Sequence, residues 1–209
     1  MAGPSLPVFV ATLGRAPLRE GIDRYDLRVC ALVKVVEDTA MKLREAGGTE
    51  RIAEKAVASP VTLREATARD LTRILEIERL AFAQPWSLDS FRRELMLPFS
   101  RIVVACDNGR ASGRLAGFLC RWLVADECHI LNVAVHPERR KMGVGMLLMI
   151  DAIDEAKTKQ IQVVTLEVRR SNLQARSLYR KLEFEERRLR HNYYGPREDA
   201  IVMELQLMH

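Results

Sequence analysis

The most informative stretch of this chain is Asn132-Val-Ala-Val-His-Pro-Glu-Arg-Arg-Lys-Met-Gly-Val-Gly145, which leads directly into the apolar segment 146–156. An extended apolar run ends there in a basic turn with two glycines, and the pattern after the turn predicts a helix. The first turn of a helix carries backbone N–H groups without internal partners, which suits a phosphate-bearing ligand. Because Gly143 and Gly145 have no Cβ, a pyrophosphate can approach the main chain closely.

The turn differs from the common nucleotide-binding loops. A P-loop requires a Lys-Ser/Thr pair after its last glycine, and none follows Gly145. A dinucleotide fingerprint requires a third glycine, which is missing from Val144-Gly-Met-Leu-Leu148. The form that remains, Arg140-Lys-Met-Gly143-Val-Gly145, resembles the acetyl-coenzyme A (acetyl-CoA) pyrophosphate loop of the GNAT N-acetyltransferases. The alternative is a glycine turn that only starts a helix.

The length and composition indicate a globular protein with one substantial core, or one domain with an appendage. The chain has 209 residues, of which 48% are hydrophobic and 29% charged. No apolar run reaches the ~20 residues that a membrane helix needs. The apolar segment Leu6–Leu13 is short and interrupted by Pro7, so we expect neither a secretory signal nor a membrane anchor.

Cysteine usage points to a reducing cytoplasm, and the net charge bears on possible partners. The four cysteines (Cys30, Cys106, Cys120 and Cys128) are widely spaced and form no Cys-x-x-Cys pair, so we expect neither a zinc site nor a disulfide framework. Cys106 and Cys120 lie in apolar strand-like runs, where we expect buried free thiols. The net charge of +5 could reflect affinity for RNA or ribosomes, although a solvated basic surface explains it more simply. No aromatic-rich basic stretch is present, so direct nucleic-acid binding is not expected.

Residues 1–60 differ from the rest and form an N-terminal extension. After an irregular start, apolar residues recur at helical spacing until Gly47-Gly48 ends the pattern. This amphipathic helix could pack against the neighbouring domain or form a dimer contact, which leaves the oligomeric state open. An over-long gene model is a third explanation.

Residues 61–209 alternate between strands and helices. The apolar patterns predict strands at 61–65, 101–107, 115–124, 128–135, 163–168, 184–191 and 200–207. They predict helices at 68–82, 87–95, 146–156 and 173–182, with Ser87 as an N-cap. Asn108-Gly109 is a hairpin signal. The inward face of the first helix is assigned to Leu71, Ile74, Leu75, Ile77 and Leu80. A mixed, strongly twisted α/β sheet flanked by helices follows.

Three downstream residues could carry amine acylation. Glu167, near the end of a strand, could take a proton from an ammonium substrate, or it could face solvent or pair with Arg169. Asn172 precedes a helix and suits an N-cap, but its amide could also reach a pantetheine arm. Tyr179 could pack in the core or protonate a departing thiolate.

Longer motifs carry a more specific resemblance. They are Leu166-Glu-Val-Arg-Arg-Ser-Asn-Leu-Gln-Ala-Arg-Ser-Leu-Tyr-Arg-Lys-Leu-Glu-Phe184, Arg190-His-Asn-Tyr-Tyr194, Glu198-Asp-Ala-Ile-Val-Met203 and Phe82-Ala-Gln-Pro-Trp86. Together they resemble the bacterial ribosomal-protein N-terminal acetyltransferases of the GNAT superfamily, over about residues 61–206. The resemblance implies the GNAT fold for 61–209 and acetyl-CoA as co-substrate.

The resemblance also implies roles for individual residues. Glu167 matches the family's proton acceptor, and Tyr179 matches its proton donor to the coenzyme A thiolate. The positions that match the cofactor-binding segments are Val133, Ala134, Val135, Arg140, Lys141, Met142, Gly143, Val144, Gly145, Met146 and Asn172. Trp86, Tyr193 and Tyr194 would flank the acceptor peptide, or they could only complete the core.

The implied reaction is a sequential transfer, without a covalent enzyme intermediate, to the N-terminal α-amine of a protein. The protein partner it suggests is a small-subunit ribosomal protein. Two alternatives stay open: a lysine side chain or small-molecule amine as acceptor, and a non-catalytic acetyl-CoA-binding module.

Two positions depart from the family pattern. Glu183 stands where members usually have a glycine in a left-handed C-cap, which predicts a strain of about 1 kcal/mol. Met146 stands where a basic residue is frequent, so one phosphate contact is expected to be missing.

Overall fold

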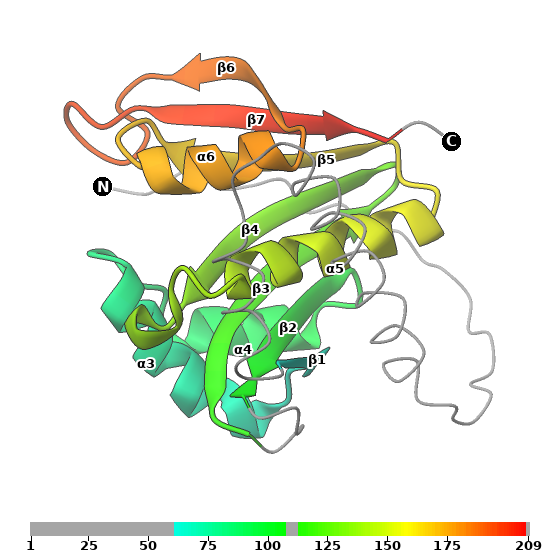
Figure 1. The fold of residues 1–209 in the computed structure, drawn as a ribbon, viewed down its shortest axis with the longest axis vertical. Coiled ribbons are helices and arrows are strands. Elements are labelled where there is room, and N and C mark those ends of the chain that lie inside the picture. Colours follow the sequence, from blue (N-terminus) through cyan, green and yellow to red (C-terminus); the bar gives the residue numbers. More distant parts are fainter. Residues whose placement is uncertain (1–60, 108–112, 208–209) are drawn as a thin grey trace, which may run out of the picture.

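The computed structural model describes residues 61–107 and 113–207, which form a seven-stranded sheet in the order β1-β2-β3-β4-β5-β7-β6 (Figure 1). The strands are β1 (Thr62–Glu65), β2 (Ser100–Cys106), β3 (Leu115–Val124), β4 (Glu127–Val135), β5 (Val163–Arg169), β6 (Glu185–Arg190) and β7 (Ala200–Gln206). Neighbours pair antiparallel except β4 and β5, which are parallel. The mixed α/β sheet is therefore confirmed.

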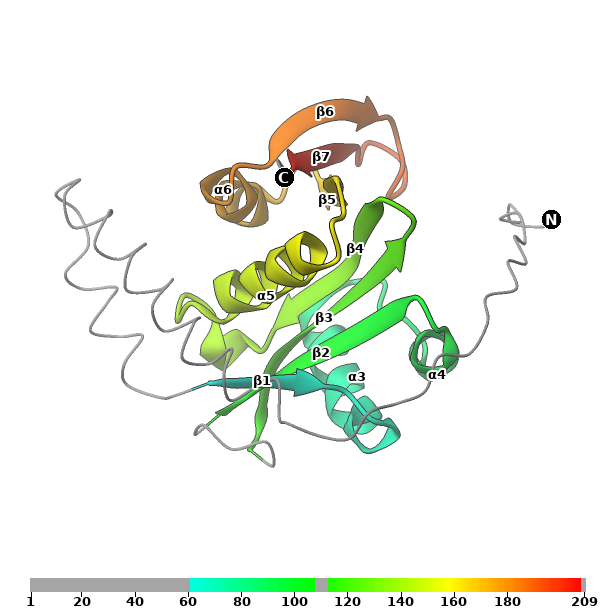
Figure 2. The same cartoon turned by 90° about the vertical axis from the view of Figure 1, so that its right-hand side faces the viewer.

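Helices cover both faces of this sheet (Figure 2). They are α3 (Leu71–Ala81), α4 (Leu88–Met96), α5 (Val144–Thr158) and α6 (Leu173–Lys181), with short 3-10 turns at Ala68–Asp70 and Pro137–Arg139. Helices α3 and α4 pack on one face, and α5 and α6 pack on the other. Strand β2 is buried on both faces, which explains why its sequence is almost continuously apolar. In the described part of the chain, no helix is long and apolar enough to cross a membrane.

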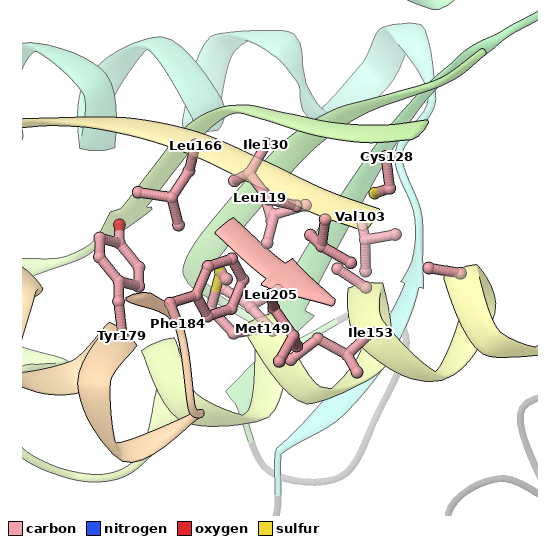
Figure 3. Packing of buried hydrophobic residues seen from close by; sticks show 14 of the residues in the cluster. Val103, Leu119, Cys128, Ile130, Met149, Ile153, Leu166, Tyr179, Phe184 and Leu205 are labelled. Carbon is pink, nitrogen blue, oxygen red and sulfur yellow. The ribbon is translucent and has the colours of Figure 1, made fainter. Parts of the chain in front are cut away.

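The core on the α5 and α6 side joins helix and strand residues into one cluster (Figure 3). Met149 and Ile153 of α5 meet Val103 and Leu119 of the sheet. Tyr179 lies at one end of the cluster, with its ring packed against that of Phe184 (Figure 3). Helix α6 is thereby held against the same core as α5.

Strands β4 and β5 diverge after a short parallel ladder (Figure 1). The ladder joins Glu127–Ile130 to Val163–Leu166, whereas β4 continues to Val135. A bulge begins the divergence, because β3 pairs with Ile130 and Asn132 but skips Leu131. One edge of residues 131–135 therefore lies outside the pairing with β5 in the described structure. Such an edge can pair with an extended ligand.

Most of the expected elements are confirmed within one or two residues, but one face assignment was wrong. Leu80 is 56% exposed, and Glu78 takes an inward position on α3 instead. Ser87 caps α4 by accepting the N–H of Ser90, as expected. The expected helix within 1–60 and the Asn108-Gly109 turn lie outside the described residues.

Candidate active site

Glu167 of β5 and Tyr179 of α6 lie on opposite faces of the sheet. Leu166 and Val168 point into the core beneath α5 and α6, so the intervening Glu167 points to the other face of the sheet. Tyr179 belongs to the core on the α5 and α6 side. A carboxyl group and a phenol thus lie on opposite faces of the sheet, at the place where β4 and β5 diverge.

Glu167 is held by groups from the C-terminal hairpin. Its carboxylate forms an ion pair with Arg190, rather than with Arg169 as the alternative reading supposed. Arg190 lies over the Tyr193 ring, 4.1 Å from its centroid. A hydrogen bond to the Glu167 carboxylate, together with burial, raises the pKa of Tyr193. The Tyr194 hydroxyl donates to the Glu167 main-chain carbonyl at 3.3 Å.

Tyr179 is 5% exposed and packs against Phe184, with ring centroids 6.0 Å apart. Burial raises the pKa of Tyr179, and the neighbouring Tyr194 phenol raises it further. Its hydroxyl therefore keeps its proton at neutral pH. This state is required of a group that donates a proton to a thiolate.

The turn before α5 has the conformation that the glycine pattern predicts. Gly143 adopts φ 82° as the N-cap residue of α5, and a Cβ there would meet nothing within 4 Å. Gly145 has ordinary contacts, since a Cβ would lie 3.5 Å from Leu178 and 3.6 Å from Val135. Only Gly143 is therefore required by the backbone itself.

Three basic residues precede these glycines, and they are not equivalent. Arg139 is tied to Asp107 at 2.9 Å, which fixes the turn to the end of β2. Arg140 is exposed and its Nε donates to the Val135 carbonyl at 3.3 Å, at the end of the unpaired β4 edge. Lys141 is exposed and adopts φ 62°.

Asn172 and the three predicted aromatic residues have identifiable structural contacts. Asn172 caps α6 by accepting the Ala175 N–H at 3.1 Å. Trp86 is half-buried against Phe91, with ring centroids 5.3 Å apart. Tyr193 is 46% exposed and lies beside Tyr194. The structure thus brings both tyrosines to Glu167, while Trp86 lies on the α3 and α4 side.

A thioester carried by a pantetheine arm and a pyrophosphate would fit these features. The edge of Val133–Val135 offers backbone hydrogen-bonding groups outside the β4–β5 ladder. The chain then passes through the basic turn to the N-terminus of α5, which favours a phosphate anion. A linear ligand with an amide-bearing arm and a phosphate end matches this order of groups.

Three residues around the site, Arg190, Asp107 and Glu78, were not predicted from the sequence. Arg190 lies in a quoted motif, but its partner became visible only in the folded sheet. Asp107 fixes Arg139, and Glu78 binds both Trp86 and Asn132. The one sequence signal for Glu78 was a carboxylate next to Ile77 on an otherwise apolar helix face.

The chain is similar to known acetyltransferases. Residues 71–184 match the family model described as "Acetyltransferase (GNAT) family". The [ribosomal protein bS18]-alanine N-acetyltransferase of Salmonella typhimurium is 36% identical over 141 residues, covering 66% of this chain and 92% of that protein.

Solved structures agree with the family model. The Escherichia coli ribosomal-protein-S18-alanine N-acetyltransferase superposes with a TM-score of 0.66 at 33% identity, covering 72% of this chain and 96% of that one. Arabidopsis thaliana NAA60, solved in complex with acetyl-CoA, shares the fold with a TM-score of 0.65 at 21% identity, covering 71% and 99%.

Proposed function

This chain belongs to the GNAT family of acetyl-CoA-dependent acetyltransferases, and from that premise we propose that it acetylates the N-terminal α-amine of a protein. The relatives named for alanine of ribosomal protein bS18 support a ribosomal protein as the acceptor. The observation that carries the proposal is the placement of Glu167 and Tyr179 on opposite faces of β5, beside the unpaired β4 edge.

Glu167 receives the proton of the acceptor in this proposal. An N-terminal amine is largely an ammonium at neutral pH and must lose its proton before it can attack a carbonyl. The Glu167 carboxylate faces the side of the sheet that carries α3 and the 82–86 segment. It can take this proton directly or through one water molecule. The acceptor must share the carboxylate with Arg190 or displace Arg190 from it.

Tyr179 supplies a proton on the opposite face. Acetyl-CoA supplies the activated acetyl group as a thioester. Because Tyr179 is buried and protonated, its hydroxyl is available to a thiolate that leaves on the α5 and α6 side. Placing the base and the acid on opposite faces gives the incoming amine and the outgoing sulfur separate routes.

Cofactor binding is assigned to β4 and the turn that follows it. Backbone groups of Val133–Val135 bind the pantetheine arm, and an N–H there polarises the thioester carbonyl. The first turn of α5, from Gly143 to Met146, binds the pyrophosphate together with Arg140, Lys141 and Met142 of the preceding turn. Asn172 combines its helix cap with a further cofactor contact.

The peptide side of the site is assigned to aromatic residues. Tyr193 and Tyr194 flank Glu167, and the segment from Phe82 to Trp86 borders the opposite side. We assign residues 61–209 to the catalytic domain and 1–60 to an extension. The protein acts in the cytoplasm, and its partner is a protein N-terminus rather than a nucleic acid or a membrane.

The direct test uses synthetic peptides with free or blocked α-amines, each containing an internal lysine. The enzyme is incubated with acetyl-CoA, and mass spectrometry locates the added acetyl groups. We expect acetylation only on free α-amines, with an alanine-first peptide from a ribosomal protein among the best acceptors. Acetylation of lysine in the blocked peptides would reassign the enzyme to side-chain acceptors. Cofactor binding without transfer to any amine would indicate a binding module.

A further inference from the structure

Glu78 is a buried carboxylate at the C-terminal part of α3. It is 1% exposed, and it accepts the main-chain N–H of Trp86 at 2.8 Å. It also accepts the side-chain amide of Asn132, with its two oxygens 3.2 Å and 3.1 Å from Nδ2. Burial raises the pKa of Glu78, and these two donors offset the rise only in part. Both donors are neutral groups.

A buried carboxylate stabilises a core less than an apolar side chain of similar size would. Burying a charge without a cationic partner costs free energy, and an apolar side chain at the same helix position would avoid that cost. The neighbouring inward residues, Ile74 and Ile77, are apolar. Packing alone therefore does not explain why a glutamate occupies position 78. Its two hydrogen-bond partners, Trp86 and Asn132, indicate its structural role.

The partners of Glu78 lie in two separate parts of the proposed site. Trp86 ends the segment that begins at Phe82, between α3 and α4. Asn132 lies next to the Leu131 bulge and immediately before Val133–Val135, the edge that diverges from β5. One carboxylate thus fastens the α3–α4 connection to β4.

We propose that Glu78 is a positioning residue, which anchors the 82–86 segment to β4 so that this segment borders the acceptor peptide. The inference rests on the proposed function for its effect on peptide binding. The hydrogen bond by which Glu78 holds Trp86 does not depend on which acceptor the enzyme uses. Glu78 touches neither reactant; it acts through Trp86 and Asn132.

The contacts of Asn132 allow a discriminating pair of substitutions. Its Oδ1 is buried and has no hydrogen-bond partner in the described structure. In Glu78→Gln, the remaining oxygen can still accept the Trp86 N–H. The new amide can donate to Asn132 Oδ1 after the Asn132 amide rotates by half a turn. Glu78→Gln therefore keeps the anchor, whereas Glu78→Ala removes it.

The experiment measures peptide acetylation and the position of the 82–86 segment separately. A Trp122→Phe background leaves Trp86 as the one remaining tryptophan, because the chain has two. In Glu78→Ala we expect acrylamide to quench Trp86 fluorescence more strongly. The peptide KM should rise roughly tenfold, which is less than the 10²-fold that a misplacement of about 1 Å can cost. Acetyl-CoA affinity should stay unchanged, and Glu78→Gln should stay close to the parent in all three measurements.

Asp70→Ala provides the matched control. Asp70 is also a buried carboxylate, beside the start of α3, but it binds Arg64 and Thr67 rather than the 82–86 segment. Its loss should lower thermal stability and leave the peptide KM unchanged. Glu78→Asp, which withdraws the carboxylate by one methylene, replaces Glu78→Ala if the alanine variant does not fold.

Two results would overturn the inference. The first is unchanged Trp86 quenching and peptide KM in Glu78→Ala, or in Glu78→Asp if it replaces the alanine variant. The second is a glutamine variant as impaired as the alanine variant, because the negative charge rather than the anchor would then matter. Failure of the parent enzyme to acetylate any peptide would remove the proposed function, but the quenching result would still decide whether Glu78 holds the loop.

Discussion

Glu167 of β5 and Arg190 of β6 form an ion pair, although β7 lies between their strands. They are 23 positions apart in the sequence. Arg190 is also stacked on Tyr193, so the C-terminal hairpin supplies both a cation and an aromatic ring to the carboxylate. The proposed base is therefore occupied by a cation of the enzyme, and an acceptor ammonium has to compete with that cation.

We expect Glu167→Gln to lower kcat by roughly 10²–10⁴-fold, the usual range for the loss of a general base. Acetyl-CoA affinity should be retained, because Glu167 lies on the face away from α5 and α6. Steady-state kinetics across pH, with calorimetric titration of acetyl-CoA, measures both quantities.

Glu204→Gln is the control for that substitution. Glu204 lies on the neighbouring strand β7 and also pairs with an arginine of β6, Arg187 at 3.6 Å, but it takes no part in the proposed site. Its kcat should match that of the parent. If the Glu167 and Glu204 variants are equally active at every pH, Glu167 is not the base.

Tyr179→Phe should lower kcat roughly 10²-fold through loss of a proton donor. The ring keeps its packing against Phe184, so the melting temperature should change little. Tyr194→Phe removes a hydroxyl that donates to a main-chain carbonyl, and its effect on kcat should be smaller. Turnover at saturating acetyl-CoA, together with thermal melts, compares the two variants. A Tyr179→Phe enzyme with parental turnover would assign the proton to water instead.

The strands were predictable because their burial leaves a direct mark on the sequence. Strand β2 is apolar almost throughout since helices cover both of its faces, and the turn at Gly143 needs a positive φ that glycine supplies. Which residues of a helix are buried was harder to predict. The pattern assigned Leu80 to the core, but Glu78 is buried because Asn132, 54 positions away, satisfies it.

The candidate site was likewise predictable only in part. The motif around Glu167 and Tyr179 could be recognised from resemblance, and the fold brings both residues to β5. The Arg190 pairing could not be predicted, since it requires β7 to lie between β5 and β6. Local patterns report local conformation and burial, whereas partners across a sheet depend on strand order.

Asp70 should make stability depend on pH in the acid range. Hydrogen bonds from Arg64, aided by the Thr67 N–H, lower the pKa of Asp70 to about 2 against the effect of burial. A depressed carboxylate contributes stability that is complete above its unfolded pKa near 4 and is lost as pH falls towards 2. We expect Asp70→Asn to lose about 2 kcal/mol at pH 7.

Urea denaturation between pH 3 and pH 7 measures this effect. The difference between the parent and Asp70→Asn should stay constant from pH 7 to pH 5 and then shrink. Asp89→Asn serves as the comparison, because Asp89 pairs with Arg92 at an exposed site and should contribute little. A difference that is the same at pH 3 and pH 7 would mean that the ionisation of Asp70 is not its source.

Glu183→Gly should stabilise the protein. Glu183 adopts φ 66° at the end of α6, which confirms the left-handed conformation that was expected there. The Phe184 N–H reaches the Tyr179 carbonyl and the Glu183 N–H reaches the Arg180 carbonyl, each at 3.0 Å, which is the Schellman pattern. Glycine relieves about 1–2 kcal/mol of backbone strain in the folded state. It also increases the conformational entropy of the unfolded chain, which offsets part of that gain in stability.

The expected net gain is therefore about 0.5–1 kcal/mol, measured by urea denaturation at neutral pH. Glu185→Gly, two residues later in the exposed strand β6, is the matched control. Glycine there brings the same entropy cost without relieving a left-handed residue, so it should destabilise. Opposite signs for the two variants would identify the backbone conformation of Glu183 as the cause. Destabilisation by both would mean that contacts of the glutamate side chain outweigh its backbone strain.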